Sequence, residues 1–247
     1  MIVCPTGSIE IGFHSACNDP VMEIVVNAAM SADGKLSTVE RRQVAISGPD
    51  DFSRVDALRA DVDAVVVGIG TVLADDPRLG LDDPAYAQSR TAEERERSPT
   101  RVVVDSAGRT PIDARILDDT ARTIILASNR ATTARIEDLE AHGAEVYVHG
   151  DRRVDLVDGF ATLTSVGIEH VLVEGGGELI FSLLAADLVD QIRVFVGNVV
   201  IGGREAPTLA DGDGFIEREE FPTLSLEAVE RIDDGVALTW SVPDVDG

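Results

Sequence analysis

A glycine-rich turn is the stretch of this sequence with the clearest potential for chemistry. The apolar residues Val171–Val173 lead into Glu174, three glycines follow at Gly175–Gly177, and a run with helical character extends over Glu178–Ala186. This order predicts a buried strand, a tight turn and the start of a helix. Glycines let a ligand approach the backbone, and the free N–H groups of a helix start favour an anion, most often a phosphate. The alternative is a turn that binds nothing, and the spacing differs from the G-x-G-x-x-G fingerprint.

Lys35 is the only lysine among the 21 basic residues of the chain. It follows Asp33 and Gly34 in a loop with turn chemistry, just after an apolar run. A chain that uses arginine everywhere else has kept one lysine here. We therefore expect Lys35 to be functional, with chance occurrence as the alternative.

Small, polar or charged residues stand where several other apolar segments end. The carboxyl ends of parallel strands meet at one edge of an open α/β sheet, and ligands bind there. We therefore expect a shared nucleotide-type site from these segments: Ala29, Gly68–Thr71, Asp105–Ser106, Ser128–Arg130 and Glu174–Gly177. Each segment alone has an ordinary alternative, such as a turn at Asp105, a helix cap at Ser128 or a helix end at Asp75–Pro77.

Apolar segments alternate with segments of helical character along most of the chain. Strands are predicted at Glu23–Ala29, Ala64–Gly68, Arg101–Val104, Thr123–Ala127, Glu145–Val148, His170–Glu174, Gln191–Val200, Leu224–Arg231 and Val236–Val242. Helices are predicted from the Ser47–Asp50 start to Arg59 or Ala60, from Thr132 or Thr133 to His142, and at Leu156–Val166 and Glu178–Ala186.

The order of these elements predicts an α/β fold with a mostly parallel sheet. No helix separates the last two strands, so we expect them to pair antiparallel. Residues 80–99 are polar and charged, which predicts a long loop with one helical turn at Ala92–Arg97. We expect one domain over residues 22–243 and a poorly ordered N-terminal extension over residues 1–21, which lack periodicity.

The sequence is strongly acidic, with 45 Asp and Glu against 21 Lys and Arg and a net charge of −24. Such a surface repels nucleic acids and anionic membranes, so we expect neither as a partner. The acidic residues are spread along the chain, as in halophilic proteins, where high salt limits the range of repulsion. No apolar run approaches the roughly 18 residues of a membrane span.

Motifs for metal or hydrolytic chemistry are missing from the sequence. It contains no P-loop, no G-x-S-x-G and no H-E-x-x-H, and the four histidines show no ligand spacing. Cys4 and Cys17 have no second pair at metal-ligand spacing. We therefore expect a reduced, cytoplasmic protein without a bound metal.

The motifs follow one another in an order that resembles one enzyme family. They are Asn27–Lys35, Leu58–Ala60, Gly70–Pro77, Val173–Gly177 and Leu188–Asp190. Over about residues 22–242 the chain is similar to the pyrimidine reductases of riboflavin biosynthesis, in the separate-chain form of archaea and fungi that lacks a deaminase domain. The resemblance implies a three-layer α/β/α, dihydrofolate-reductase-like fold. It also implies a homodimer, for which Gln191–Val200 is a candidate interface strand.

The resemblance implies reduction of 2,5-diamino-6-ribosylamino-4(3H)-pyrimidinone 5′-phosphate to the ribitylamino product, with NADPH preferred and NADH possible. It implies cofactor contacts at Ala29, Thr71, Asp75, Ser106, Gly175, Gly176, Gly177 and Glu178, and substrate contacts at Arg59, Leu79 and Glu174. Arg130, at a predicted strand end, is expected to meet the 2′-phosphate of NADPH. A proton must also reach the substrate, and the sequence does not rank the candidate catalytic residues Asp33, Lys35 and Glu174.

One position departs from the family pattern. Related bifunctional enzymes have an arginine after the Asp-Asp-Pro segment that helps to hold the substrate phosphate, and Asp82 stands near that place here. Arg78, Arg59 or Gln43 would then have to hold the phosphate. Two further functions stay open: a same-fold reductase of another pyrimidine or pterin substrate, and a non-catalytic NADP-binding sensor.

Overall fold

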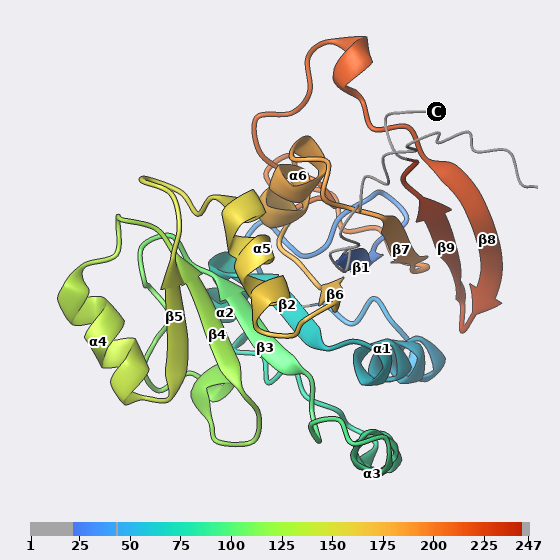
Figure 1. Ribbon diagram of the computed structural model, residues 1–247. Coiled ribbons are helices and arrows are strands. Elements are labelled where there is room, and N and C mark those ends of the chain that lie inside the picture. Colours follow the sequence, from blue (N-terminus) through green and yellow to red (C-terminus); the bar gives the residue numbers. More distant parts are fainter. Residues whose placement is uncertain (1–21, 43, 244–247) are drawn as a thin grey trace, which may run out of the picture.

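The computed structural model describes residues 22–42 and 44–243, which form one nine-stranded sheet flanked by helices (Figure 1). The strands are β1 (Glu23–Met30), β2 (Ala64–Gly68), β3 (Thr100–Val104), β4 (Thr123–Ala127), β5 (Ala144–Val148), β6 (His170–Val173), β7 (Gln191–Val196), β8 (Ser225–Ile232) and β9 (Gly235–Ser241). The helices are α1 (Pro49–Asp61), α2 (Ile69–Asp75), α3 (Pro84–Ala92), α4 (Thr133–Ala141), α5 (Leu156–Ser165) and α6 (Gly177–Ala185), with short 3-10 helices at Arg115–Leu117 and Arg218–Glu220. The expected extension at residues 1–21, with Cys4 and Cys17, lies outside the described residues, as does Gln43.

The strand order in the sheet is β5-β4-β3-β2-β6-β1-β7-β9-β8. The strands from β5 to β7 pair in parallel, whereas β9 pairs antiparallel with both β7 and β8. β6 is late in the sequence but lies between β2 and β1, where strands cover both of its edges. The expected mostly parallel sheet with antiparallel C-terminal strands is confirmed.

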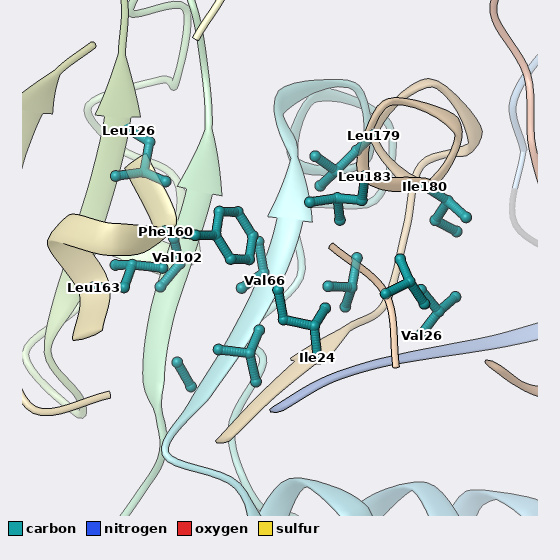
Figure 2. Packing of buried hydrophobic residues seen from close by; sticks show 14 of the residues in the cluster. Ile24, Val26, Val66, Val102, Leu126, Phe160, Leu163, Leu179, Ile180 and Leu183 are labelled. Carbon is teal, nitrogen blue, oxygen red and sulfur yellow. The ribbon is translucent and has the colours of Figure 1, made fainter. Parts of the chain in front are cut away.

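Alternating residues of the buried strands supply two separate apolar layers. In β1, Ile24 and Val26 belong to one layer and Val25 to the other. Figure 2 shows the first layer, to which Phe160 of α5 and Leu183 of α6 contribute. Helices α1, α2 and α4 pack on the opposite layer, which completes the three-layer arrangement. Each fully buried aliphatic side chain stabilises the fold by about 1.5–3 kcal/mol, so a one-residue slip of a strand would disrupt both layers at once.

β7 is shorter than the strand expected at Gln191–Val200, because it ends at Val196. It lies between β1 and β9, so both of its edges are hydrogen-bonded within the sheet. Ile192, Val194 and Phe195 are buried in the core of this chain. The edges of β7 are therefore taken within this chain, and β8 is the strand at that end of the sheet.

The polar segment 80–99 contains a helix that the sequence pattern did not indicate. α3 spans Pro84–Ala92 and precedes the helical turn expected at Ala92–Arg97, so the expectation of a long loop is wrong. The helix start has a local cause. Asp83 is the N-cap and accepts a hydrogen bond from the Ala85 N–H group at 2.8 Å, while Pro84 takes the first helical position.

α3 is held to the rest of the protein by arginine side chains. Arg90 is 3% exposed, and its guanidinium donates to the carbonyls of Ala60 (2.7 Å), Val62 (2.8 Å) and Glu96 (2.8 Å). Arg95 donates to the Ala60 and Val62 carbonyls as well. The last carbonyls of a helix have no partner within it, so these two arginines satisfy the end of α1.

We expect Arg90→Met to lower the free energy of unfolding by about 2–4 kcal/mol, because the Glu96 carbonyl loses the Arg90 donor and the Ala60 and Val62 carbonyls keep only the hydrogen bonds from Arg95. Arg97→Met is the matched control, since Arg97 is exposed on the same segment. Urea denaturation of both variants measures the difference. Equal unfolding midpoints for the two variants would contradict this role of Arg90.

Candidate active site

β2 and β6 are neighbouring strands whose chains leave the sheet in opposite directions. β2 continues through α2 to β3 on one side, and β6 continues through α6 to β7 on the other. Ligands of open α/β sheets bind in the crevice beyond such a pair of strand ends. The ladder between β1 and β6 stops at Val26 and Val173, while β1 continues beside β7 to Met30. The last residues of β1, including the half-buried Ala29, therefore run past the end of β6.

Backbone hydrogen bonds tie the glycine turn to the end of β2. The Glu174 N–H group donates to the Val66 carbonyl at 2.9 Å, and the Gly68 N–H group donates to the Gly175 carbonyl at 2.8 Å. Gly175 has a φ of +134°, a conformation that residues with a side chain rarely adopt. Gly176 is the N-cap of α6, and no side chain caps this helix start. The helix start therefore offers N–H groups to a ligand rather than to its own chain.

Gly176 and Gly177 are small for different reasons. A Cβ on Gly176 would have only Thr71 Oγ1 nearby, at 3.6 Å, so this position faces open space. A Cβ on Gly177 would lie 2.5 Å from the Thr208 carbonyl oxygen and 2.6 Å from Asp211 Oδ2. Gly177 is therefore required by packing, whereas Gly176 and Thr71 border open space at the start of α6.

Arg59 of α1 and Glu174 form a bidentate ion pair at the end of β6. Arg59 Nε and Nη2 donate to Glu174 Oε1 and Oε2, both at 2.7 Å, and Nη1 donates to the Gly80 carbonyl at 3.0 Å. The two side chains are 19% and 11% exposed. Burial alone would lower the pKa of Arg59, but the Glu174 carboxylate outweighs burial and the net shift is upward. The pair joins α1 to the glycine turn and commits both carboxylate oxygens.

Asp33 and Lys35 share the loop after β1, but their side chains make different contacts. Asp33 is exposed and accepts hydrogen bonds from Ser31 Oγ (2.6 Å) and from two backbone N–H groups of residues 201–202 (3.0 and 2.7 Å). These hydrogen bonds, that of Ser31 first, lower the pKa of the Asp33 carboxyl to about 2. Lys35 is half-buried, and its Nζ donates to the Ala206 carbonyl at 3.2 Å. Asp33 is therefore ionised at neutral pH, whereas Lys35 keeps N–H groups for a ligand.

Ser106 and Arg130 lie on the loops after β3 and β4, which are hydrogen-bonded to each other. Ser128 donates to the Ser106 carbonyl through its N–H group (3.3 Å) and its Oγ (2.8 Å), and the Arg130 N–H group donates to Ser128 Oγ at 3.3 Å. Ser106 Oγ accepts from the Val154 N–H group at 3.1 Å, so the loop after β5 joins this group. The Arg130 side chain is exposed. These loops share the sheet edge with the glycine turn because their strands are parallel.

Asp75 and Leu79, two of the expected ligand contacts, lie in the segment after β2, where the first is exposed and the second is buried. Asp75 is the exposed last residue of α2, and partial desolvation raises the pKa of its carboxyl. Leu79 has a φ of +53° and is 3% exposed, so its side chain lies in the core and only its backbone can face a ligand. The N–H groups of Asp82 and Asp83 both donate to the buried Asp56 of α1 at 2.8 Å. Asp56 therefore holds the stretch where the family pattern has an arginine.

The irregular segment after β7 contributes to the site in a way that the sequence did not indicate. Lys35 pairs with Thr208 in an isolated β-bridge, and the Asp211 N–H group donates to the Gly177 carbonyl at 3.1 Å. The segment thus connects Lys35 to the glycine turn. Thr208 and Asp211 were missed because this stretch has no hydrophobic period. The available signal was Gly202–Gly203, both of which have positive φ.

Within the described residues, an uncapped helix start, the Lys35 ammonium group and the Arg59–Glu174 ion pair lie at one edge of the sheet. Within residues 22–42 and 44–243, no group of three or more His, Cys, Asp or Glu side chains is arranged to hold a metal ion. None of the helices in these ranges is long and apolar enough to cross a membrane.

The mostly parallel sheet and the glycine turn at its switch point define an α/β protein of the kind that binds nucleotides at the carboxyl edge of its strands. The chain belongs to the RibD C-terminal domain family, whose profile matches residues 22–238. The family expected from the motifs is thus confirmed.

Two archaeal relatives match most of the chain. The 2,5-diamino-6-ribosylamino-4(3H)-pyrimidinone 5′-phosphate reductase of Archaeoglobus fulgidus is 44% identical over 216 residues, which cover 87% of this chain and 96% of the relative. The protein of the same name from Methanothermobacter thermautotrophicus is 41% identical over 219 residues, covering 89% and 97%.

Solved structures share the fold. A pyrimidine reductase-like protein from Corynebacterium diphtheriae matches with a TM-score of 0.79 at 18% identity, over 90% of this chain and 92% of the other. At this identity the likeness concerns the fold alone.

Proposed function

We propose that this protein is an NADPH-dependent reductase that converts 2,5-diamino-6-ribosylamino-4(3H)-pyrimidinone 5′-phosphate to its ribitylamino product in riboflavin biosynthesis. The observation that carries the proposal is the open space beside Gly176 and Thr71 at the uncapped start of α6. The two archaeal relatives bear the name of this reductase and match over nearly their whole length, which supports the same substrate.

The proposed cofactor site follows the carboxyl edge of the sheet. A nicotinamide cofactor, when bound, supplies the hydride. We assign its pyrophosphate to Gly175, Gly176, Gly177 and the backbone of Glu178, with Thr71 beside them. We assign the nicotinamide half of the cofactor to Ala29 and Asp75. We assign the adenosine half to Ser106 and Arg130.

Among the three candidate proton donors we assign the role to Lys35. Asp33 is a carboxylate with a pKa of about 2, so it carries no proton to give at neutral pH. Glu174 accepts from Arg59 with both oxygens, and we assign this pair to positioning the substrate. The ammonium group of Lys35 donates one hydrogen bond to the Ala206 carbonyl and has three protons, so it can serve a substrate oxygen.

The proposed reaction needs one proton and one hydride. The bond between C1 and the ring oxygen of the ribose breaks, Lys35 gives its proton to that oxygen, and the amino nitrogen forms a double bond to C1. Hydride addition to C1 then returns the electron pair to nitrogen and yields the secondary amine of the ribitylamino product. Lys35 regains a proton from solvent, so the balance is one NADPH and one proton for each substrate.

We assign the substrate phosphate to Arg78. Arg59 is committed to Glu174 and the Gly80 carbonyl, and Asp82 occupies the place of the family's arginine. Arg78 is exposed on the same segment, close in sequence to Gly80. An arginine can bind a phosphate with two parallel N–H groups, which suits this position.

Gly176→Val is expected to weaken NADPH binding by at least about a hundredfold, or about 3 kcal/mol, because its side chain enters the space assigned to the pyrophosphate. The fold should be retained, since a Cβ at this position meets only Thr71 Oγ1 at 3.6 Å. Gly177→Ala is the contrast, because its Cβ would overlap the Thr208 carbonyl and destabilise the fold. Fluorescence titration and circular dichroism of the same samples measure both effects.

Oxidation of NADPH by the wild-type protein, with and without the ribosylaminopyrimidine phosphate, separates the possible functions. Turnover only with this substrate supports the proposal. Turnover only with another pyrimidine or pterin would indicate the same-fold alternative, and binding without turnover would indicate a sensor. Folded Gly176→Val protein with unaltered NADPH affinity would show that the cofactor binds elsewhere.

Arg130→Ala should reduce the preference for NADPH over NADH by about tenfold or more, because a charged hydrogen bond to the 2′-phosphate is lost. Arg122→Ala is the matched control. Arg122 is an exposed arginine at the opposite end of β4, where it pairs with Glu145 at 2.7 Å. The measurement is the ratio of kcat/KM for NADPH to kcat/KM for NADH. An unchanged ratio in Arg130→Ala would show that Arg130 does not bind the 2′-phosphate.

We propose a homodimer formed through the β8–β9 hairpin, which stands at one end of the sheet (Figure 1). Leu226 and Val229 are 57% and 60% exposed and lie opposite Trp240 and Leu238 of β9. Two chains of net charge −24 repel each other, so the dimer requires salt, as in a cytoplasm of high ionic strength. Sedimentation should show a dimer in molar KCl and a monomer for Val229→Glu. A wild-type monomer in molar KCl excludes the dimer.

A further inference from the structure

We infer that Asp33 is a positioning residue whose carboxylate clamps the segment after β7 onto the loop after β1 and thereby fixes Lys35. The clamp is a property of the fold, while its effect on turnover rests on the proposed function. Asp33 itself does not touch the reacting atoms in this assignment.

The carboxylate of Asp33 spans two segments that are far apart in sequence. Oδ1 accepts from Ser31 Oγ at 2.6 Å and from the Ile201 N–H group at 3.0 Å, and Oδ2 accepts from the Gly202 N–H group at 2.7 Å. Hydrogen bonds to an ionised acceptor are stronger than those between neutral groups. The irregular segment around residues 201–202 has no strand or helix to hold it, so the carboxylate replaces regular structure there.

Ser31 transmits the position of this clamp to Lys35. Its hydroxyl donates to Asp33 and accepts from the Lys35 N–H group at 2.9 Å, and its own N–H group donates to the Lys35 carbonyl at 2.9 Å. Ser31 is fully buried, so this turn has a fixed place relative to β1. The backbone of Lys35 is therefore tied to the same hydroxyl group that the Asp33 carboxylate orients.

The clamped segment holds the other end of Lys35. Farther along it, the Ala206 carbonyl accepts from Lys35 Nζ at 3.2 Å, and the Pro207 carbonyl accepts from the Leu36 N–H group at 2.9 Å. If the clamp opens at residues 201–202, the backbone contacts of Ala32 and Leu36 still tie the segment to the loop after β1, but the Ala206 carbonyl that accepts from the ammonium group is held less firmly. A displaced proton donor lowers turnover without changing the distant cofactor contacts.

Asp33→Asn tests the clamp because the amide NH2 group in place of Oδ2 cannot accept from the Gly202 N–H group, and the neutral amide oxygen accepts more weakly from Ser31 and Ile201 than the carboxylate does. Asp119→Asn is the matched control, since Asp119 is exposed and lies outside this group of loops. Three measurements apply to both variants: amide hydrogen exchange at Ile201 and Gly202, the NMR signal of the Lys35 ammonium group, and steady-state kinetics. Lys35 is the only lysine, so its side-chain signal is unique in the spectrum.

For Asp33→Asn we expect at least about tenfold faster exchange at both amides, a changed Lys35 signal, and a kcat at least about tenfold lower with unchanged affinity for NADPH. The pH dependence of the remaining activity should match that of the wild type, because Lys35 still gives the proton. Asp119→Asn should change none of these quantities.

Each contrary result has a distinct meaning. Unchanged exchange or an unchanged Lys35 signal in Asp33→Asn would overturn the clamp, whether or not the protein has activity. A changed pH profile would overturn it too, by making Asp33 the acid. A wild-type protein that reduces no pyrimidine substrate would refute the proposed function alone, because exchange and the Lys35 signal are measured without turnover.

Discussion

The position of β6 between β2 and β1 is the constraint on which the rest of this structure depends. Five other parallel strands, β1 to β5, precede β6 in the sequence, yet β6 lies inside the sheet with both of its edges paired. Its chain must then turn sharply at the carboxyl edge, where the Gly175 carbonyl accepts the Gly68 N–H group. Side chains are poorly tolerated at such a turn, because Gly175 has positive φ and Gly177 faces the Thr208 carbonyl. The open helix start beside Gly176 is a consequence of this packing.

Several buried arginines lie where one guanidinium group donates hydrogen bonds to several acceptors. Arg90 closes the end of α1, Arg59 joins α1 to Glu174, and Arg101, 1% exposed, donates to Asp118 and the Ala121 carbonyl. Arginine suits these roles because its planar guanidinium presents five donors in fixed directions. The single lysine stands instead where one mobile ammonium group faces the site.

The site is assembled from loops that have little regular structure of their own. The loop after β1 and the segment after β7 are joined through the Asp33 carboxylate, and the Asp211 N–H group joins that segment to α6 by donating to the Gly177 carbonyl. The sheet provides the rigid base, since its buried strands resist displacement. The loops can then carry polar groups, because side chains and neighbouring loops satisfy their backbone.

The sequence by itself determined the strands and helices with a clear hydrophobic pattern, and the motifs at their ends. β2 and β4 were predicted with their observed bounds, because continuous Val, Ile and Leu runs are typical of strands buried on both faces. The antiparallel hairpin followed from the absence of a helix between its strands. The glycine turn and Lys35 could be recognised because both are rare local patterns. The helix α3 was missed because it has few apolar residues, and hydrophobic periodicity does not indicate a helix that is held in place by the hydrogen bonds of Arg90.

Only the tertiary structure decided which distant groups meet. The strand order places β6 between β2 and β1, and no local pattern encodes that choice. The pairing of Arg59 with Glu174 joins residues 115 positions apart, and the Asp33 carboxylate reaches amides 168 and 169 positions away. β7 has an apolar sequence that suits an interface or a core equally well, and burial between β1 and β9 selects the core. Such contacts depend on packing of the whole chain, because hydrogen bonds and ion pairs act through space over a few ångströms, whatever the separation along the sequence.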